Sequence, residues 1–282
     1  SYLELLAQTI TRVLRTPGRH RQCVAEASFD AWTKFYRPDE NAPNALVSYY
    51  AKGALVALAL DLWLRRASAG QRSLDTLMQR LWQRFGATGA GVPEGEIEHL
   101  AQELGGAEVA ASLAQAVHGT DDLPLSELLA PYGIAVIVRP AESDQDKGGK
   151  PAAPAVRART SLDARFADGA DARLAHVFTG GAAHAAGLAA GDVIVAVAGI
   201  KATRANIDKL LNEHAVGARV TAHAFRRDEL LTFELVLAAA AADTCELRLD
   251  PSAPAAAQQR RAAWLGRRLT GDITPDITLG VT

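Results

Sequence analysis

The side chains that could hold a metal or act as a general base are scattered along this chain. Its seven histidines lie at positions 20, 99, 118, 176, 184, 214 and 223, with no His-Glu-x-x-His pattern among them. His99 and Glu103 are four residues apart on an expected helix and could share a ligand, but a zinc site needs three or four ligands. We interpret this pair as a solvated helix face, and the residue pattern alone predicts no complete catalytic set.

A pair of tyrosines stands at the start of the longest apolar region. Tyr49 and Tyr50 follow Ser48, a favourable helix N-cap residue, and precede Lys52 and Gly53. A phenol has a pKa of about 10, stays protonated at neutral pH and can donate a hydrogen bond to a developing anion without adding charge. The pattern alone favours a simpler role for Tyr50, as a core aromatic hydrogen bonded to backbone at a helix start.

Length and composition indicate a globular protein of two domains. The chain has 282 residues, of which 49% are hydrophobic and 22% charged, and a domain usually has about 100 to 200 residues. The 30 Lys and Arg residues against 32 Asp and Glu leave a formal charge of -2. Because no broad basic field exists to bind a phosphate backbone, nucleic acid is not an expected partner.

Cysteine usage and apolar stretches bear on location. Cys23 and Cys245 are far apart and fit no metal or redox spacing, so we expect reduced structural thiols and, by default, a cytoplasmic protein. The apolar stretch Ala54–Leu64 is too short to span a bilayer and contains Asp61, so no membrane partner is expected. The start, Ser1–Leu5, lacks the features of a signal peptide. It also has no initial Met, so we expect a fragment of a longer protein.

The first half of the chain has the apolar periodicity of helices. Apolar residues recur there at three- and four-residue spacing, and serine or glycine residues stand where helices should begin and end. The stretch 28–47 has aromatics and turn residues with weak periodicity and is interpreted as extended chain. We expect an all-α array in a domain of residues 1–140, with helices at 3–15, 49–66, 74–85, 94–104, 107–118 and 125–130.

The second half has the period-two alternation of strands. A helix carrying Ile207 and Leu211 is expected after Thr203, and the polar, Gly- and Pro-containing stretch 141–155 is interpreted as a linker. The fold class is therefore a multidomain α + β protein, with a second domain at 156–242 and a tail at 243–282 that contains one helix around 258–269. Strands are expected at 133–139, 173–178, 193–197, 220–226 and 230–237.

One segment of the second domain is similar to the core of bacterial PDZ domains. It reads Ala186-Gly187-Leu188-x-x-Gly191-Asp192-x-Ile194. The resemblance implies a small β-sandwich or barrel with a groove between an edge strand and a helix. An extended peptide can enter such a groove as an added strand, and backbone amides hold its carboxyl terminus. The expected peptide-binding residues are Leu162, Asp163, Ala164, Arg165, Ile207 and Leu211.

Two positions depart from the PDZ pattern. Asp163 stands where a glycine is common in the loop that binds the carboxylate, and its negative charge would oppose a bound carboxylate. Ala182 stands where a proline commonly starts the helix. A PDZ-like module that only packs against its neighbour therefore remains an alternative to a working peptide groove.

Nearly the whole chain resembles the glycyl aminopeptidase family of zinc metallopeptidases. The similarity lies in the aromatic-rich segment 29–41, in Asn44 and in the Tyr-x-Lys-Gly motif that begins at Tyr50. Members of this family carry a thermolysin-like helical catalytic domain followed by a PDZ domain, and the two expected domains have the same order here. Further matching segments are 81–86, 91–93 and 225–230.

This resemblance implies a zinc aminopeptidase that removes glycine or other small residues from peptide substrates. The family's three zinc ligands precede the region corresponding to Ser1, so zinc is expected in the full-length protein and none in this chain, which alone should hydrolyse nothing. The family's motif tyrosine donates a hydrogen bond to the oxyanion, which assigns the catalytic role to Tyr50; Lys52 and Gly53 are expected to orient the helix start. A non-catalytic adaptor, whose PDZ-like module binds peptides or a partner subunit, is the alternative.

Overall fold

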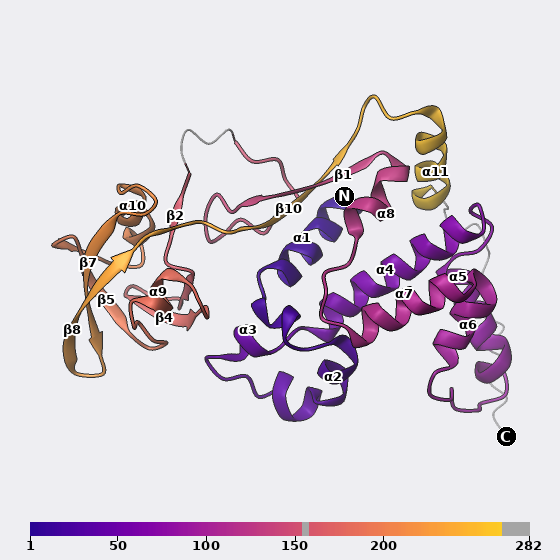
Figure 1. Ribbon diagram of the computed structural model, residues 1–282, viewed down its shortest axis with the longest axis horizontal. Coiled ribbons are helices and arrows are strands. Elements are labelled where there is room, and N and C mark those ends of the chain that lie inside the picture. Colours follow the sequence, from indigo (N-terminus) through magenta and orange to yellow (C-terminus); the bar gives the residue numbers. More distant parts are fainter. Residues whose placement is uncertain (154–157, 267–282) are drawn as a thin grey trace, which may run out of the picture.

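The molecule has two packed parts joined by a long two-stranded ribbon (Figure 1). A computed structural model describes residues 1–153 and 158–266. One hydrophobic core lies among the helices of the amino-terminal half, and a second lies in the part formed by residues 158–239, which we call the β module. The chain is thus a mixed α + β protein with antiparallel sheets, as the sequence predicts at that level.

The helical part is an array of short helices around one long helix. Four predicted helices, α1, α4, α7 and α8, are confirmed to within one residue at each end. The stretch 28–47, predicted as extended chain, instead contains a π-helical turn, η2, and the short helix α3. The bounds are α1 Tyr2–Leu14, η1 Pro17–His20, α2 Val24–Phe29, η2 Ala31–Phe35, α3 Ala42–Ala45, α4 Tyr49–Ala67, α5 Leu74–Leu81, η3 Trp82–Gly86, α6 Glu96–Gly105, α7 Ala107–His118, α8 Leu125–Leu129 and η4 Ala130–Tyr132.

Helix α4 is the centre of the helical part. Its Asp61 is only 8% exposed, and the carboxylate accepts hydrogen bonds from Arg65 Nε at 2.8 Å and from the backbone N–H of Leu74 at 2.9 Å. A buried charge needs such partners, because burial removes it from water. By length and composition the segment Ala42–Ala67 could cross a membrane, but 56% of its apolar window is buried within the fold, which agrees with a core helix.

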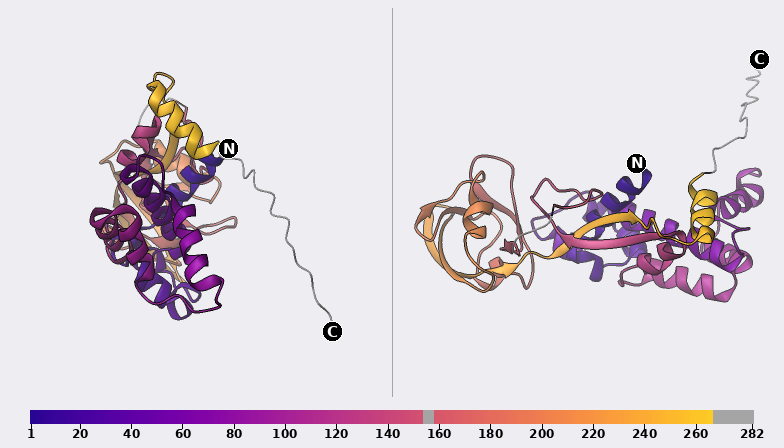
Figure 2. Two further views of the ribbon diagram at one scale, coloured as in Figure 1. Left: turned by 90° about the vertical axis from the view of Figure 1, so that its right-hand side faces the viewer. Right: turned by 90° about the horizontal axis from the view of Figure 1, so that it is seen from above.

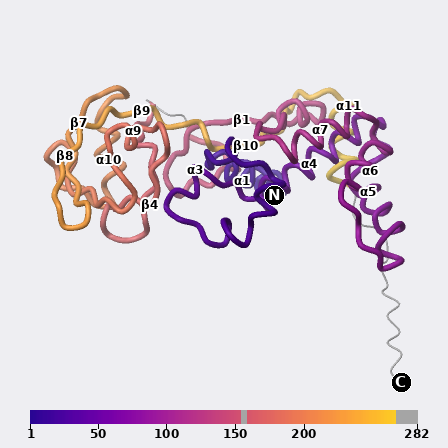
Figure 3. The backbone as a smooth tube through the Cα atoms, turned by 60° about the horizontal axis from the view of Figure 1, so that its bottom comes forward, coloured from indigo at the N-terminus to yellow at the C-terminus, as the bar shows by residue number. Residues whose placement is uncertain are grey.

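The ribbon returns the chain from the β module to the helices. Strand β1 (Ile134–Pro140) pairs antiparallel with β10 (Ala242–Leu249), and the two strands run side by side (Figure 2, Figure 3). Cys245 and Leu247 of β10 are buried in the helical core. These two residues belong to the segment that the sequence assigned to a tail, 243–282, and they complete the first core. Helix α11 (Ala255–Leu265) follows, and the part of the predicted tail and helix beyond 266 lies outside the described residues.

The β module contains an open sheet and two short helices. Its strand order is β3-β4-β5-β7-β8, with β6 paired to β5. No hydrogen-bond ladder joins β3 to β8 among the described residues, so the closed barrel that the sequence allowed is wrong. The bounds are β2 Thr160–Ser161, β3 Ala164–Phe166, β4 Ala172–Val177, α9 Ala182–Ala185, β5 Val193–Val197, β6 Ile200–Lys201, α10 Ile207–Asn212, β7 Arg219–Arg226, β8 Glu229–Val236 and β9 Ala238–Ala239, which pairs with β2.

The Ala-Gly-Leu-x-x-Gly-Asp segment shapes the turn between α9 and β5. Gly187 and Gly191 have φ angles of 84° and 91°, which a residue with a side chain rarely adopts. Asp192 is 1% exposed, and its carboxylate accepts hydrogen bonds at 2.8 Å from the backbone N–H of Ala189 and from Arg226 Nη2. The residue types that mark this segment are therefore explained by backbone geometry and a buried ion pair.

Hydrogen bonds hold the β module against the helical part. Asn44 of α3 donates from Nδ2 to the carbonyl of Val177 at 2.9 Å and accepts at Oδ1 from the N–H of Thr179 at 3.0 Å. His176 Nδ1 lies 3.0 Å from the carbonyl oxygen of Glu40. The end of β4 is thus attached to the segment that leads into α4.

The loop after β1 is folded, although the sequence predicts a linker at 141–155. The carboxylate of Asp146 accepts hydrogen bonds from Arg139 Nη1 at 2.6 Å and from the N–H groups of Glu142 at 3.0 Å and Gly148 at 2.9 Å. Burial alone would raise the pKa of Asp146, but these donors hold it at about 2. Residues 154–155 of the predicted linker, and 156–157 of the predicted second domain, lie outside the described residues.

We expect Asp146→Asn to lower the free energy of unfolding by about 2 kcal/mol at neutral pH, because a neutral amide replaces a hydrogen-bonded carboxylate. A depressed carboxyl pKa adds stability above its ordinary value of 3.8, and this contribution is lost as the pH falls towards about 2. Urea unfolding of both proteins over this pH range measures the effect, and the difference should shrink on acidification. A difference independent of pH would contradict the explanation.

Candidate functional site

The tyrosine pair lies at the exposed start of α4. Ser48 caps this helix, its hydroxyl accepting from the N–H of Ala51 at 3.2 Å, and so fixes the first turn. Tyr50 is 61% exposed, whereas Tyr49 is half-buried. The exposure of Tyr50 does not fit the core aromatic that the residue pattern alone favours. Of the two phenols, that of Tyr50 is the more accessible to a substrate.

A third tyrosine, Tyr36, joins this pair. Its hydroxyl lies 2.8 Å from that of Tyr50 and 3.0 Å from that of Tyr49. Tyr36 directly follows the π-helical turn η2, whose Phe35 packs edge-on against the rings of Tyr36 and Tyr49, with centroids 5.4 Å apart in each case. The ring of Trp32 lies 5.2 Å from that of Tyr36. These five aromatic residues, which we call the aromatic cluster, thus surround the start of α4.

Sequence reasoning did not single out Tyr36. The weak periodicity of the stretch 28–47 did not indicate which residues share a helix face. A π-helical turn also changes the residue spacing along a face from that of an α-helix. The available signal was the density of aromatics in the segment that resembles the glycyl aminopeptidases. Phe29 and Trp32 of that segment are 90% and 80% exposed, so these aromatics do not build the helical core.

The shared hydroxyl separates the pKa values of Tyr49 and Tyr50. Hydrogen bonding to Tyr36 lowers the pKa of Tyr50, because this bond stabilises the charged form. Hydrogen bonding to the same partner raises the pKa of Tyr49. The Tyr50 phenol is therefore the more acidic of the two and the better hydrogen-bond donor.

Lys52 of the Tyr-x-Lys-Gly motif is buried beneath the start of α4. It is 2% exposed, and its ammonium donates to the carbonyl of Arg19 in η1 at 3.2 Å. Burial lowers the pKa of Lys52, and the charge of Asp122 opposes that effect. A Cβ at Gly53 would meet only Val24, at 4.0 Å, so steric crowding does not require glycine there. Lys52 thus ties the first turn of α4 to η1.

The described residues do not fit a zinc site. No group of three or more His, Cys, Asp or Glu side chains lies close enough to hold a metal within 1–153 and 158–266. The predicted pair at His99 and Glu103 is split: Glu103 binds Arg84 at 2.5 Å, and the His99 ring lies 3.8 Å from Glu96 and is 76% exposed. A metal would have to be held by residues that these ranges do not contain.

Three of the predicted peptide-binding residues face the interior of the β module. Leu162, Ile207 and Leu211 are 3%, 0% and 3% exposed and belong to its hydrophobic core. Ala164 and Arg165 on β3 are half-buried. Ile207 is enclosed in this core, whereas Leu162 and Leu211 also border the cavity described below, and β3 forms the edge of the sheet.

Asp163, which stands where the PDZ-like sequence pattern commonly has glycine, has a backbone conformation that glycine favours. Its φ is 52°, in the left-handed region that glycine favours. Its N–H donates to the hydroxyl of Ser161 at 2.9 Å, and its carboxylate lies 3.4 Å from the N–H of Ala182 at the start of α9. Aspartate tolerates this region better than most residues, so the backbone shape of the loop is retained while a charge is added.

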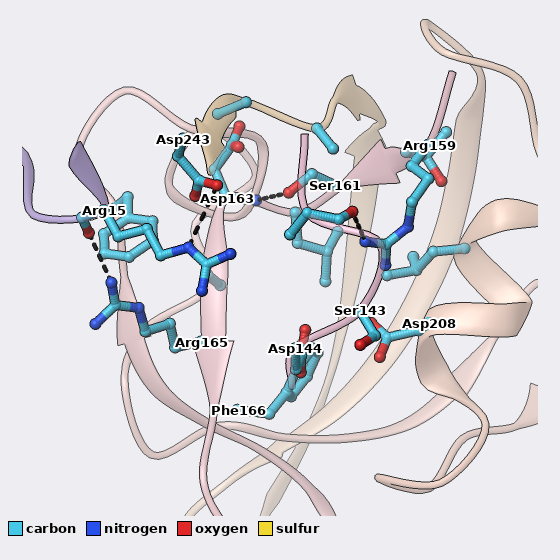
Figure 4. A pocket seen from close by; sticks show the side chains of 18 of the residues that line it. Arg15, Ser143, Asp144, Arg159, Ser161, Asp163, Arg165, Phe166, Asp208 and Asp243 are labelled. Carbon is cyan, nitrogen blue, oxygen red and sulfur yellow. Dashed lines mark hydrogen bonds and ion pairs between the residues drawn. The ribbon is translucent and has the colours of Figure 1, made fainter. Parts of the chain in front are cut away.

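A cavity of about 490 Å³ lies between the β module and the helical part (Figure 4). Ion pairs cross or border it: Arg204 of the β module pairs with Asp144 of the loop after β1, and Arg15 Nε binds Asp243 at 3.3 Å. Arg165 Nη2 donates to the carbonyl of Arg15 at 2.6 Å. A ligand here would touch both parts. The wall of the β module includes Leu162, Asp163, Ala164, Arg165, Phe166 and Leu211, and the opposite wall includes residues of 14–19, 141–145 and 240–243.

Comparisons with known proteins identify a peptidase relationship. Residues 1–56 match the model of the M61 glycyl aminopeptidase family. The crystal structure of an aminopeptidase N family protein from Idiomarina loihiensis is similar with a TM-score of 0.84 and 37% identity, over 94% of this chain and 44% of that chain. This chain therefore spans less than half the length of that relative.

Two other comparisons found no further relative. An HtrA-type protease with a decapeptide has a TM-score of 0.27 and 18% identity, over 34% of this chain and 32% of that chain, which is too low to compare folds. No curated protein matches the chain.

We expect Tyr50 to titrate at a lower pH than Tyr49. The reason is that the bond to Tyr36 lowers the pKa of Tyr50 and raises that of Tyr49. NMR of the chain labelled with ¹³C at the tyrosine ζ carbons, assigned through single Tyr→Phe variants, measures each pKa. A Tyr49 that ionises before Tyr50 would show that the hydrogen bonds run in another direction.

Proposed function

The chain belongs to the M61 glycyl aminopeptidase family, and on that premise we propose that the full-length protein is a zinc-dependent aminopeptidase in which Tyr50 stabilises the oxyanion. The observation that carries the proposal is an exposed phenol at the start of α4, within the residues that match the family model. Family resemblance adds a preference for glycine or small residues at the amino terminus of the peptide.

The zinc ion in this proposal is held outside the described residues. A zinc ion activates water and polarises the scissile carbonyl, and we propose that the part of the protein beyond this chain holds it. The exposure of Tyr50, Trp32 and Phe29 supports this division, because large aromatic side chains that lie exposed together mark a surface for another element or for substrate. This chain alone is then expected to be inactive.

Tyr50 contributes a hydrogen bond that is strongest in the transition state. Its proton points at the carbonyl oxygen, which gains negative charge when the carbonyl carbon is attacked. A neutral phenol makes this bond without placing another charge beside the substrate, and the lowered pKa of Tyr50 strengthens it. Tyr49 is less suited, because its pKa is raised and its ring is half-buried.

We expect Tyr50→Phe in the full-length protein to lower kcat by about 100- to 1000-fold, the usual loss for one oxyanion donor. KM should change little, because the bond forms mainly in the transition state. Hydrolysis of a glycyl anilide at saturating substrate measures this, with zinc content and unfolding temperature checked for each protein. Tyr2→Phe, at an exposed tyrosine of α1, is the matched control and should keep wild-type turnover.

Two results would count against the enzyme proposal. Near-normal kcat in a folded, zinc-loaded Tyr50→Phe protein would remove the assigned role of Tyr50. A full-length coding sequence without His-Glu-x-x-His would remove zinc peptidase activity altogether and favour the adaptor, in which the β module binds peptides or a partner subunit.

We further propose that the β module is a PDZ domain that binds peptide carboxyl termini along β3. The cavity between the two parts supports a binding function, because Asp163, Ala164 and Arg165 all line it. The small exposed fractions of Leu162 and Leu211, which also line the cavity, favour recognition mainly through backbone hydrogen bonds, with a small apolar contribution from these two side chains. The Asp144–Arg204 ion pair beside the cavity restricts access, so binding should be weak.

We expect Asp163→Gly to tighten the binding of a peptide carboxyl terminus by about 3- to 10-fold, as removal of one like charge near the surface allows. Glycine keeps the positive φ of this position, so the loop should stay folded. NMR titration of this chain with a carboxyl-terminal peptide library measures affinity, and the same peptides with amidated ends are the control. No binding at millimolar concentration to either protein would favour a module that only packs.

A further inference from the structure

We propose that Tyr36 is a positioning residue that donates its hydroxyl proton to Tyr50 and so leaves the Tyr50 proton free for the substrate, an inference that rests on the oxyanion role proposed above. The observation is the pair of contacts made by one hydroxyl, at 2.8 Å to Tyr50 and 3.0 Å to Tyr49. Tyr49, Tyr36 and Tyr50 then form a hydrogen-bond chain that ends at the substrate.

The number of protons decides which hydroxyl donates to which along these hydrogen bonds. A phenol has one proton to donate and can also accept hydrogen bonds, so Tyr36 can donate to Tyr50 or to Tyr49, but not to both. If Tyr50 donated to Tyr36, its only proton would be used and none would remain for a carbonyl oxygen. A productive Tyr50 must therefore accept from Tyr36. Tyr36 is then free to accept from Tyr49, so all three hydroxyls are used without conflict.

The pKa shifts of the pair agree with this direction. A phenol that accepts a hydrogen bond is easier to ionise, and the pKa of Tyr50 is lowered. A phenol that donates its proton is harder to ionise, and the pKa of Tyr49 is raised. Hydrogen bonds in series also polarise one another, so donation by Tyr49 to Tyr36 strengthens the bond from Tyr36 to Tyr50.

Aromatic packing holds Tyr36 in place. Its ring packs against Trp32 and Phe35, with centroids 5.2 and 5.4 Å apart. The ammonium of Lys34 in the same turn is paired with Asp30, at 2.6 Å from Oδ2. Ring packing should therefore survive a change from Tyr36 to Phe, which removes the hydroxyl and keeps the ring.

A double-mutant cycle in the full-length protein tests the role. We expect Tyr36→Phe to lower kcat by about 3- to 10-fold, the range for one neutral hydrogen bond, with KM unchanged. In a Tyr50→Phe background the same change should have no further effect, because its target is gone. An unchanged kcat in Tyr36→Phe, or an equal loss in both backgrounds, would overturn the proposal.

A second measurement separates this inference from the function on which it rests. In this chain, ¹³C NMR of the tyrosine ζ carbons should show that Tyr36→Phe raises the pKa of Tyr50, whereas Tyr2→Phe leaves it unchanged. This shift needs no catalysis. An unshifted Tyr50 would overturn the hydrogen-bond direction even if Tyr50→Phe is inactive, whereas a shifted Tyr50 with a fully active Tyr50→Phe enzyme would instead reject the oxyanion function.

Discussion

The pairing of β1 with β10 is the constraint on which the arrangement of the whole chain depends. Its register runs from Ile134 opposite Leu249 to Pro140 opposite Ala242, so the chain enters and leaves the β module through two adjacent strands. Cys245 and Leu247 then complete the core of the helical part. The β module is therefore held at both of its ends, and the cavity that it shares with Arg15 and Asp243 exists because β10 returns beside α1.

The elements with local patterns could be predicted from the sequence, whereas the pairing of distant segments could not. Helices α4 and α7 follow from apolar spacing, with Ser48 at the start of α4, because a helix face is set by residues three and four apart. Strand β1 was predicted, but β10, which lies in the segment assigned to a tail, was missed, and so was the pairing of these two strands across about a hundred residues. The loop at 141–153 has the composition of a linker, but Asp146 gives it a folded structure that composition does not encode.

The candidate site was predicted only in part, because a local motif marks one of its residues and the fold alone brings the other to it. Tyr50 could be identified because it stands in a short motif, and the structure places its phenol in the open. Tyr36 lies beside Tyr50 only because of the fold of the segment between them. The π-helical turn before Tyr36 has a different residue spacing from an α-helix, so the sequence does not indicate on which side Tyr36 lies. In the β module, Ile207 and Leu211 were predicted to line a groove; both belong to the hydrophobic core, and Leu211 also borders the cavity. Apolar type alone does not distinguish these two places.

The β module also bears on the tyrosines, because it holds the segment that connects them. Tyr36 and Tyr50 are joined by a chain segment that passes through α3, and Asn44 in α3 is fixed by two hydrogen bonds to the end of β4. A free loop of this length would cost entropy to close and would allow many relative positions of its ends. Attachment in its middle divides the loop into two shorter ones, each with less freedom. A hydrogen bond of 2.8 Å between two exposed phenols needs such support, since solvent competes for both hydroxyls. The β module is thereby part of what orients Tyr50, although it contributes no side chain to the aromatic cluster.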